Sequence, residues 1–107
     1  MDLVFRALAD ESRRALLDSL SAKSAQTLGE LCSGLSQGRG AMTRQAVSKH
    51  LAILEEANLV ASVKRGREKL HFLNPVPIAE IGNRWIRKFE RARGDALVDL
   101  KRKLESE

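Results

Sequence analysis

The chain has 107 residues, of which 43% are hydrophobic and 31% are charged, and its net charge at pH 7 is +5. This composition excludes a disordered chain and predicts one globular domain with a modest core, to which burial against a second copy would add. A membrane-spanning helix is excluded because no apolar run approaches about 18 residues. The basic charge suits a polyanionic partner, whether a nucleic acid, a membrane surface or an acidic protein.

The start of the chain and its cysteine content indicate a compartment. The N-terminal apolar stretch is too short for a signal peptide, and an acid stands at position 2. The single cysteine, Cys32, excludes an internal disulfide and fits a reducing environment. We therefore expect a cytoplasmic protein.

Three short helices are predicted in the first third of the chain, each from apolar residues at helical spacing. Asp10 and Thr27 stand where the N-cap residues of the second and third helices are expected. Residues 21–26 are expected to form a turn, and the glycine-rich segment 34–42 a loose loop. The apolar positions are Leu3, Val4, Phe5 and Leu8 in the first helix, Leu16, Leu17 and Leu20 in the second, and Leu28, Leu31 and Leu35 in the third.

A fourth helix is predicted to begin after its N-cap, Thr43, and to end near Asn58, with Val47, Leu51 and Leu54 on its buried face. Two short strands, 59–63 and 69–73, follow it as a hairpin. Side chains alternate between the two faces of a strand. In the second strand we expect Leu70 and Phe72 to face the body of the domain.

The opposite face of the fourth helix carries short polar side chains that suit a major groove. Gln45 can hold an adenine edge through two hydrogen bonds, and Ser48 can bond several base edges. Arg44 and Lys49 can reach guanine or phosphate. Thr43 and the first unpaired N–H groups of the helix favour a phosphate oxygen. An ordinary amphipathic surface helix is the alternative interpretation.

The turn between the two strands is strongly basic, with four cations within six residues, and Gly66 allows it to be tight. Glu68 is the single acid there, and a solvated turn is the alternative to contact with a DNA backbone or minor groove. A helix that fits a major groove, followed directly by a cationic hairpin, is the layout of a winged helix-turn-helix protein. The residues predicted to contact DNA are Thr43, Arg44, Gln45, Ser48, Lys49, His50, Lys64, Arg65, Arg67 and Lys69.

A long last helix is predicted from Pro77 onward, with one apolar stripe along about 40 Å of its length at 1.5 Å per residue. So small a body cannot cover this stripe, so we expect a second copy to cover it. Gly94 weakens the helix by about 1 kcal/mol and favours a bend or a frayed end. The residues predicted to form a dimer interface are Leu3, Phe5, Ile81, Trp85, Phe89, Leu97 and Leu100.

Several stretches of the chain closely resemble the ArsR-type (arsenical-resistance repressor-like) winged helix-turn-helix family, over roughly residues 3 to 90. They are Leu8-Ala9-Asp10-Glu11-Ser12-Arg13-Arg14, Leu28-Gly29-Glu30-Leu31, Arg44-Gln45-Ala46-Val47-Ser48-Lys49-His50-Leu51, Asn58-Leu59-Val60 and Arg65-Gly66-Arg67-Glu68-Lys69-Leu70-His71-Phe72. The resemblance implies a bacterial transcriptional regulator, usually a homodimeric repressor that a signal releases from its operator. It also implies a dimer interface made by the first and last helices.

The chain departs from this family pattern in two places. The segment Gly34 to Met42 is longer than the usual turn, and it is interpreted as a flexible surface loop or as a site where Arg39 touches phosphate. The family's metal-sensing members carry clustered thiolates, or acids and histidines in the last helix, whereas here Cys32 stands alone. The run 74–78 resembles a subgroup not built around a metal, so we expect no metal and no cofactor.

The remaining polar residues carry no expected catalysis. Cys32, His50 and His71 are too far apart in sequence to predict a metal site. Cys32 is interpreted as a small core residue, His50 as a packing or phosphate contact, and His71 as an outer-face residue of its strand. We find no Ser/His/Asp group, no phosphate loop and no pair of carboxylates in an expected cleft, so we expect no enzyme. The pair Glu55-Glu56 is interpreted as a solvated helix end, and Trp85 as dimer interface or as part of a small-molecule pocket between subunits.

The sequence thus predicts a mainly α-helical fold with a small β-hairpin. Residues 1–107 are expected to form one domain, with residues 10–73 as its DNA-binding core and residues 1–9 and 77–105 as dimerisation helices. The expected function is repression from a palindromic double-stranded DNA operator, read by helix 43–58 and wing 59–73, with a small-molecule inducer left open. A metal- or redox-responsive repressor using Cys32 is the first alternative, and a winged-helix protein-interaction module is the second.

Overall fold

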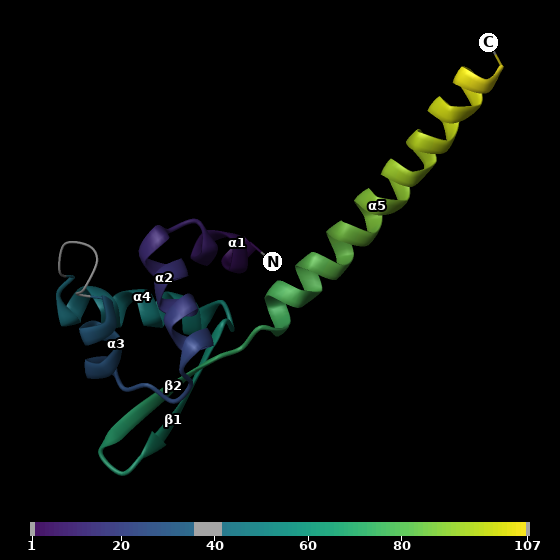
Figure 1. Cartoon of the computed structure of the whole chain (residues 1–107). Coiled ribbons are helices and arrows are strands. Elements are labelled where there is room, and N and C mark those ends of the chain that lie inside the picture. Colours follow the sequence, from purple (N-terminus) through teal and green to yellow (C-terminus); the bar gives the residue numbers. More distant parts are fainter. Residues whose placement is uncertain (1, 36–41, 107) are drawn as a thin grey trace. The chain divides into compact units, whose positions relative to one another are not determined.

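The computed structural model describes residues 2–35 and 42–106 (Figure 1). It forms two units, one up to Pro77 and one from Ile78 onward. The elements in chain order are α1 (Asp2–Leu8), α2 (Glu11–Ala22), α3 (Leu28–Leu35), α4 (Arg44–Glu56), β1 (Val60–Arg65), β2 (Glu68–Leu73) and α5 (Val76–Glu105). The predicted fold class, mainly helical with one antiparallel hairpin, is confirmed.

Side chains cap the N-termini of the three helices of the core. The Asp10 carboxylate accepts hydrogen bonds from the N–H groups of Ser12 and Arg13, at 2.8 and 3.1 Å. Thr43 Oγ1 accepts from the N–H of Ala46 at 3.0 Å. Each cap satisfies N–H groups that have no partner within the helix, so the predicted starts of α2 and α4 are confirmed.

Helix α3 begins with a capping box. Thr27 Oγ1 accepts from the N–H of Glu30 at 3.2 Å, and Glu30 Oε1 accepts from the N–H of Thr27 at 3.2 Å. These reciprocal bonds satisfy two exposed donors at once. Residues 36–41 lie outside the described part of the chain, and with them Arg39 and most of the predicted loop.

The core of the first unit is built from leucine and valine side chains of α2, α3, α4 and the approach to β1. Burying each of them contributes about 1.5–3 kcal/mol, more than the helix propensities of any two residues other than proline differ. The largest fully buried side chains are Leu16, Leu20, Leu31, Val47, Leu54 and Leu59. Because Val47 and Leu54 are in this set, the rotation of α4 about its axis is fixed and its opposite face is exposed.

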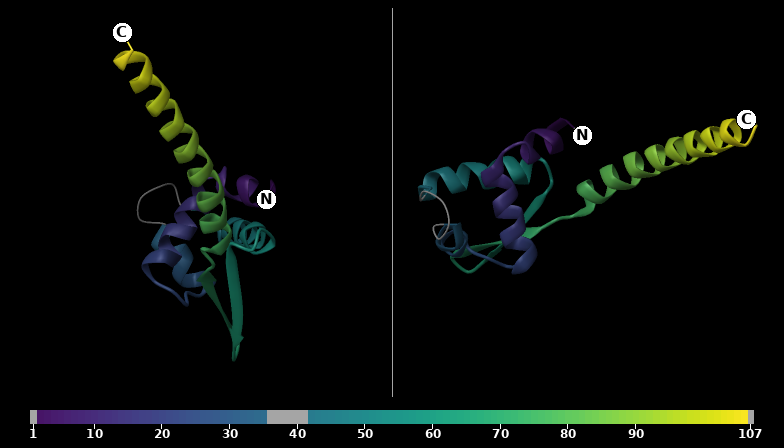
Figure 2. Two further views of the ribbon diagram at one scale, coloured as in Figure 1. Left: turned by 90° about the vertical axis from the view of Figure 1, so that its right-hand side faces the viewer. Right: turned by 45° about the horizontal axis from the view of Figure 1, so that its top comes forward.

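The hairpin has a two-residue turn in which Arg65 pairs with Glu68. Gly66 adopts a φ of +63°, as the first central residue of such a turn requires. Opposed residues share a face, so one face carries Val60, Ser62, Lys64, Lys69, His71 and Leu73, and the other carries Ala61, Val63, Arg65, Glu68, Leu70 and Phe72. The left view of Figure 2 shows the turn at the end of the hairpin that projects away from the helices of the first unit.

The prediction that His71 lies on the outer face of its strand, with Leu70 and Phe72 inward, is wrong. His71 is only 4% exposed, while Leu70 and Phe72 are half-buried on the other face. The cause is a β-bridge to Gln26, whose carbonyl accepts from the His71 main-chain N–H at 2.9 Å. The expected turn over residues 21–26 is likewise shorter, because α2 continues to Ala22 and Gln26 pairs with β2.

Helix α5, apart from its first two residues, forms the second unit. It starts at Val76, one residue before the predicted Pro77, and continues through Gly94 to Glu105. The bend or frayed end expected at Gly94 is wrong, because strong helix formers on both sides of this glycine offset its cost. No described residue of α5 is buried, so its apolar stripe is exposed in the single chain. Within residues 2–35 and 42–106, no helix is both long and apolar enough to cross a bilayer.

Candidate nucleic-acid interface

The exposed face of α4 carries the side chains that the sequence predicted for base contact. Arg44, Gln45, Ser48 and Lys49 are all exposed. Their exposure follows from the burial of Val47, Leu51 and Leu54 on the opposite side, since residues about half a helical turn apart face in opposite directions. The helix therefore presents amide, hydroxyl and ammonium groups to solvent.

A groove of about 450 Å³ separates α4 from the hairpin and from the first turn of α3. Arg44, Ser48 and Glu55 line it from α4, while Gln45 and Lys49 lie further round the helix. The other lining residues are Thr27, Leu28, Gly29, Leu51, Ala52, Arg67, Glu68, Lys69 and His71. Cations of the hairpin and polar residues of α4 thus lie on the two sides of one groove.

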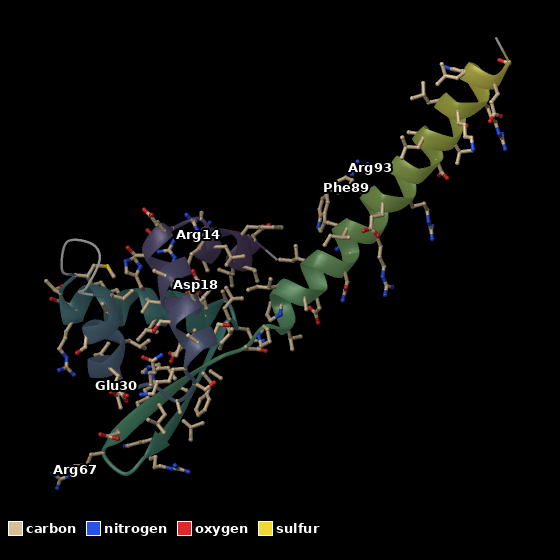
Figure 3. All side chains as sticks on the ribbon, in the orientation of Figure 1. Arg14, Asp18, Glu30, Arg67, Phe89 and Arg93 are labelled. Atoms are coloured by element: carbon tan, nitrogen blue, oxygen red, sulfur yellow. The ribbon has the colours of Figure 1, made fainter. Side chains whose placement is uncertain are left out.

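The four cations of the hairpin are all exposed, but they are placed differently. Arg65 directly precedes the turn and Arg67 is the second of its two residues, and Figure 3 shows Arg67 at the tip of the hairpin. Lys64 and Lys69 are opposed on the inner face, and the ammonium of Lys69 lies 3.3 Å from Oε1 of Glu55.

Glu55 was predicted to be part of a solvated helix end, and this is wrong. Its side chain is 27% exposed, and it faces the groove and Lys69. The reason is that the last turn of α4 packs beside the hairpin, since α4 contacts the adjacent β1. Sequence reasoning missed this residue because its partner is supplied by the folded hairpin.

His50 lies on a different side of α4 from Gln45 and Lys49. Its Nδ1 is 3.3 Å from the guanidinium of Arg13, which also donates to the carbonyls of Ala7 and Arg6, at 2.8 and 3.0 Å. The Arg13 side chain is 12% exposed and connects α1, α2 and α4. This placement favours the packing role predicted for His50 over a phosphate contact. No sequence pattern pointed to Arg13, because its partners come from α1 and α4.

Two carboxyl groups near helix starts have shifted pKa values. Burial raises the pKa of Asp10, but hydrogen bonds from the main chain of Arg13 and Ser12 and the Arg13 charge outweigh it, so the pKa is lowered. The pKa of Glu30 is lowered by hydrogen bonds, first from the Thr27 main chain and then from the Lys23 side chain. Figure 3 shows Glu30 on α3. Both groups are therefore charged caps at neutral pH.

Cys32 lies in a second, shallow hollow formed by α3, the connection between α2 and α3, and Arg44 of α4. Its side chain is half-buried and does not belong to the core. His50 and His71 lie in other surroundings, against Arg13 and Gln26. Among the described residues, no three His, Cys, Asp or Glu side chains are close enough to hold a metal ion. The lining of this hollow also includes Lys23, Glu30, Ser33 and Arg44.

The residues predicted for a dimer interface are accessible in the single chain. Leu3 and Phe5 are exposed on α1, and Trp85 is 39% exposed on α5. The rings of Trp85 and Phe89 lie 5.7 Å apart, and the ammonium of Lys88 lies 5.6 Å from the Trp85 ring centroid. Ile81 is half-buried, and the remaining exposed members are Phe89, Leu97 and Leu100.

Three features define the class of the winged helix-turn-helix DNA-binding proteins. They are the packing of α3 against α4, the exposed face of α4 and the basic hairpin. Residues 8–63 match the family model described as "Helix-turn-helix domain". The chain belongs to this family, as a transcriptional regulator of the ArsR-like type. The resemblance predicted from the sequence is thus confirmed.

Individual relatives agree with this assignment. The chain is 40% identical to the uncharacterized HTH-type transcriptional regulator YuzN of Bacillus subtilis, over 79% of this chain and 94% of the relative. It is 35% identical to an HTH-type transcriptional regulator of Mycobacterium tuberculosis, over 75% of this chain and 69% of the relative. Its fold is similar to that of an ArsR-like transcriptional regulator from Rhodococcus sp. RHA1, with a TM-score of 0.74 and 29% sequence identity. The match covers 99% of this chain and 91% of the Rhodococcus chain.

Proposed function

We propose that this regulator is a homodimeric repressor that binds a palindromic operator. Residues 43–58 would enter the major groove, and the wing, residues 59–73, would lie against the flanking backbone. The observation that carries the proposal is the exposed polar face of α4 beside the cationic hairpin, on the two sides of one groove. Gln45 and Ser48 then read base edges, and Arg65 and Arg67 bind phosphates.

The dimer would form through α1 and α5. Exposed apolar side chains on one long stripe are unusual in a soluble monomer, and a second copy would bury them. A two-fold axis would also present two copies of α4 to half-sites about one DNA turn, roughly 34 Å, apart. The 1–107 chain would then act as one domain, in the cytoplasm where its DNA lies, and without catalytic activity.

The test begins with genomic fragments that the protein protects from nuclease, which supply an operator. Affinity for that operator is then measured from 50 to 200 mM salt. If the dimer makes about six to ten phosphate contacts, affinity should fall about 10³- to 10⁵-fold over this range. Lys101→Gln removes one exposed charge outside the proposed surface and should leave the dependence unchanged. Affinity that does not change with salt would contradict the proposal.

A redox- or metal-responsive repressor is a second candidate, because the Cys32 thiol is only half-buried. In that case zinc or a thiol oxidant would release the wild-type protein from DNA, and Cys32→Ser would abolish the response. If a small-molecule inducer is the signal instead, zinc and thiol oxidants should change the DNA binding of neither wild type nor Cys32→Ser. A winged-helix module that binds only proteins would show no affinity for any protected fragment.

A further inference from the structure

We propose that Glu55 and Lys69 form a tie that positions the wing against α4, and that Lys69 is a positioning residue and not a phosphate ligand. The inference rests on the proposed function, in which α4 and the wing contact one DNA duplex. It revises the role predicted for Lys69, which was grouped with the three other cations of the hairpin.

The contact joins α4 directly to β2, whereas the main packing of α4 against the hairpin is through β1. Glu55 lies in the last turn of α4, and Lys69 is the second residue of β2. Their charged atoms are 3.3 Å apart. A two-stranded hairpin alone is marginally stable, so its orientation depends on lateral contacts of this kind.

The surroundings of the pair make the lysine charge necessary. Oε1 of Glu55 is buried and has no hydrogen-bond partner among the described residues, so the Lys69 ammonium is the charge that offsets its desolvation. Lys69 is also directly opposite Lys64 on the inner face of the hairpin. Like charges in that position repel, and the carboxylate of Glu55 relieves the repulsion.

The base of the hairpin is held separately, through the main-chain bridge between Gln26 and His71. Lys69 lies two residues closer to the tip than His71, and the tip residues Arg65 and Arg67 lie beyond it. A tie at Lys69 therefore fixes the segment from which the phosphate-binding arginines project. A DNA phosphate would have to displace Glu55 in order to bind Lys69. DNA binding should therefore release no counterion through a contact at Lys69.

The first experiment compares the salt dependence of operator binding for Lys69→Gln and Arg67→Gln, which lose the same charge. Arg67→Gln should make the log–log slope shallower by about one per subunit. Lys69→Gln should leave the slope unchanged and weaken binding roughly tenfold, because the wing loses its position. Lys69→Arg keeps the charge and should restore affinity. A slope that falls equally in Lys69→Gln and Arg67→Gln would overturn the proposal.

The second experiment measures hydrogen exchange of the hairpin amides in the protein without DNA, so it does not depend on the operator. Glu55→Gln and Lys69→Gln should both speed exchange over residues 62–70, and Arg67→Gln should not. Glu55→Gln also releases Lys69, so its binding to non-operator DNA should acquire a steeper slope by about one per subunit. Unchanged exchange in both tie variants would overturn the proposal. If wild type and Arg67→Gln bind DNA with no salt dependence, the proposed function itself has failed, and a DNA-positioning role for the tie falls with it.

Discussion

The imidazole Nδ1 and the main-chain N–H of His71 both donate to the main-chain carbonyl of Gln26, each at 2.9 Å. A carbonyl can only accept, so Nδ1 carries the proton in this arrangement. The side-chain amide of Gln26 in turn donates to the carbonyls of Ser19 and Lys23, at 3.0 and 2.8 Å. The end of α2, the connection that leads into α3 and the base of the wing therefore share one hydrogen-bond network.

Replacing Gln26 should destabilise the fold. Gln26→Ala leaves the carbonyls of Ser19 and Lys23 without their side-chain donor in a buried site, which costs about 1–3 kcal/mol. Urea unfolding at fixed protein concentration measures the loss. The exposed residue Gln45 supplies a matched control, because Gln45→Ala should change stability by less than about 0.5 kcal/mol. Equal effects of the two substitutions would show that the network is not important for stability.

The charged cap of α2 should make stability depend on pH. The pKa of Asp10 is lowered below its ordinary value of 3.8 in the folded chain. The unfolded chain therefore binds the proton more readily than the folded chain. The stabilisation is fully present at pH values above the ordinary pKa, and it is lost as the pH falls through the lower pKa of the folded chain. Unfolding of wild type and Asp10→Asn should differ at pH 7 and converge toward pH 3. Asp10→Ala should cost about 1 kcal/mol at pH 7 through loss of the cap. A constant gap between wild type and Asp10→Asn from pH 7 to 3 contradicts this assignment.

The helix and the wing should give different phenotypes. Gln45→Ala should lose discrimination at particular base pairs, by about 1–3 kcal/mol each. Arg65→Ala or Arg67→Ala should weaken binding to all sequences and lower the salt slope by about one per contact. Affinities for a panel of operator variants separate these outcomes. If Gln45→Ala weakens every sequence equally, the predicted reading face of α4 is wrong.

Features set by neighbouring residues could be predicted from the sequence, and features set by distant contacts could not. The starts of α2, α3 and α4 follow from Asp10, Thr27 and Thr43, whose caps act within three residues. The buried face of the wing does not follow, because β2 carries apolar residues on both faces. Its orientation is set by Gln26, which is 45 positions away from His71.

The predicted site shows the same division. Helical periodicity was sufficient to place Gln45 and Lys49 on the exposed face of α4. The four cations of the wing look equivalent in sequence, but one of them faces a carboxylate in the fold. Glu55, which supplies that carboxylate, is fourteen positions before Lys69, and no local pattern connects the two.

Dimerisation should depend on α5, and operator binding on dimerisation. Trp85 lies on the apolar stripe with Ile81 and Phe89, and it is 39% exposed in the single chain. Truncating the Trp85 side chain costs about 3–5 kcal/mol where the site is fully buried. Trp85→Glu should cost more, because it would place an unpaired carboxylate in the interface. Asn83→Glu is the matched control, because residue 83 is exposed on the other side of the helix. Sedimentation and operator binding should show a folded monomer with weak affinity for Trp85→Glu and a dimer with wild-type affinity for Asn83→Glu. A monomeric Trp85→Glu protein that still binds the palindromic operator at wild-type affinity would show that this helix has another role.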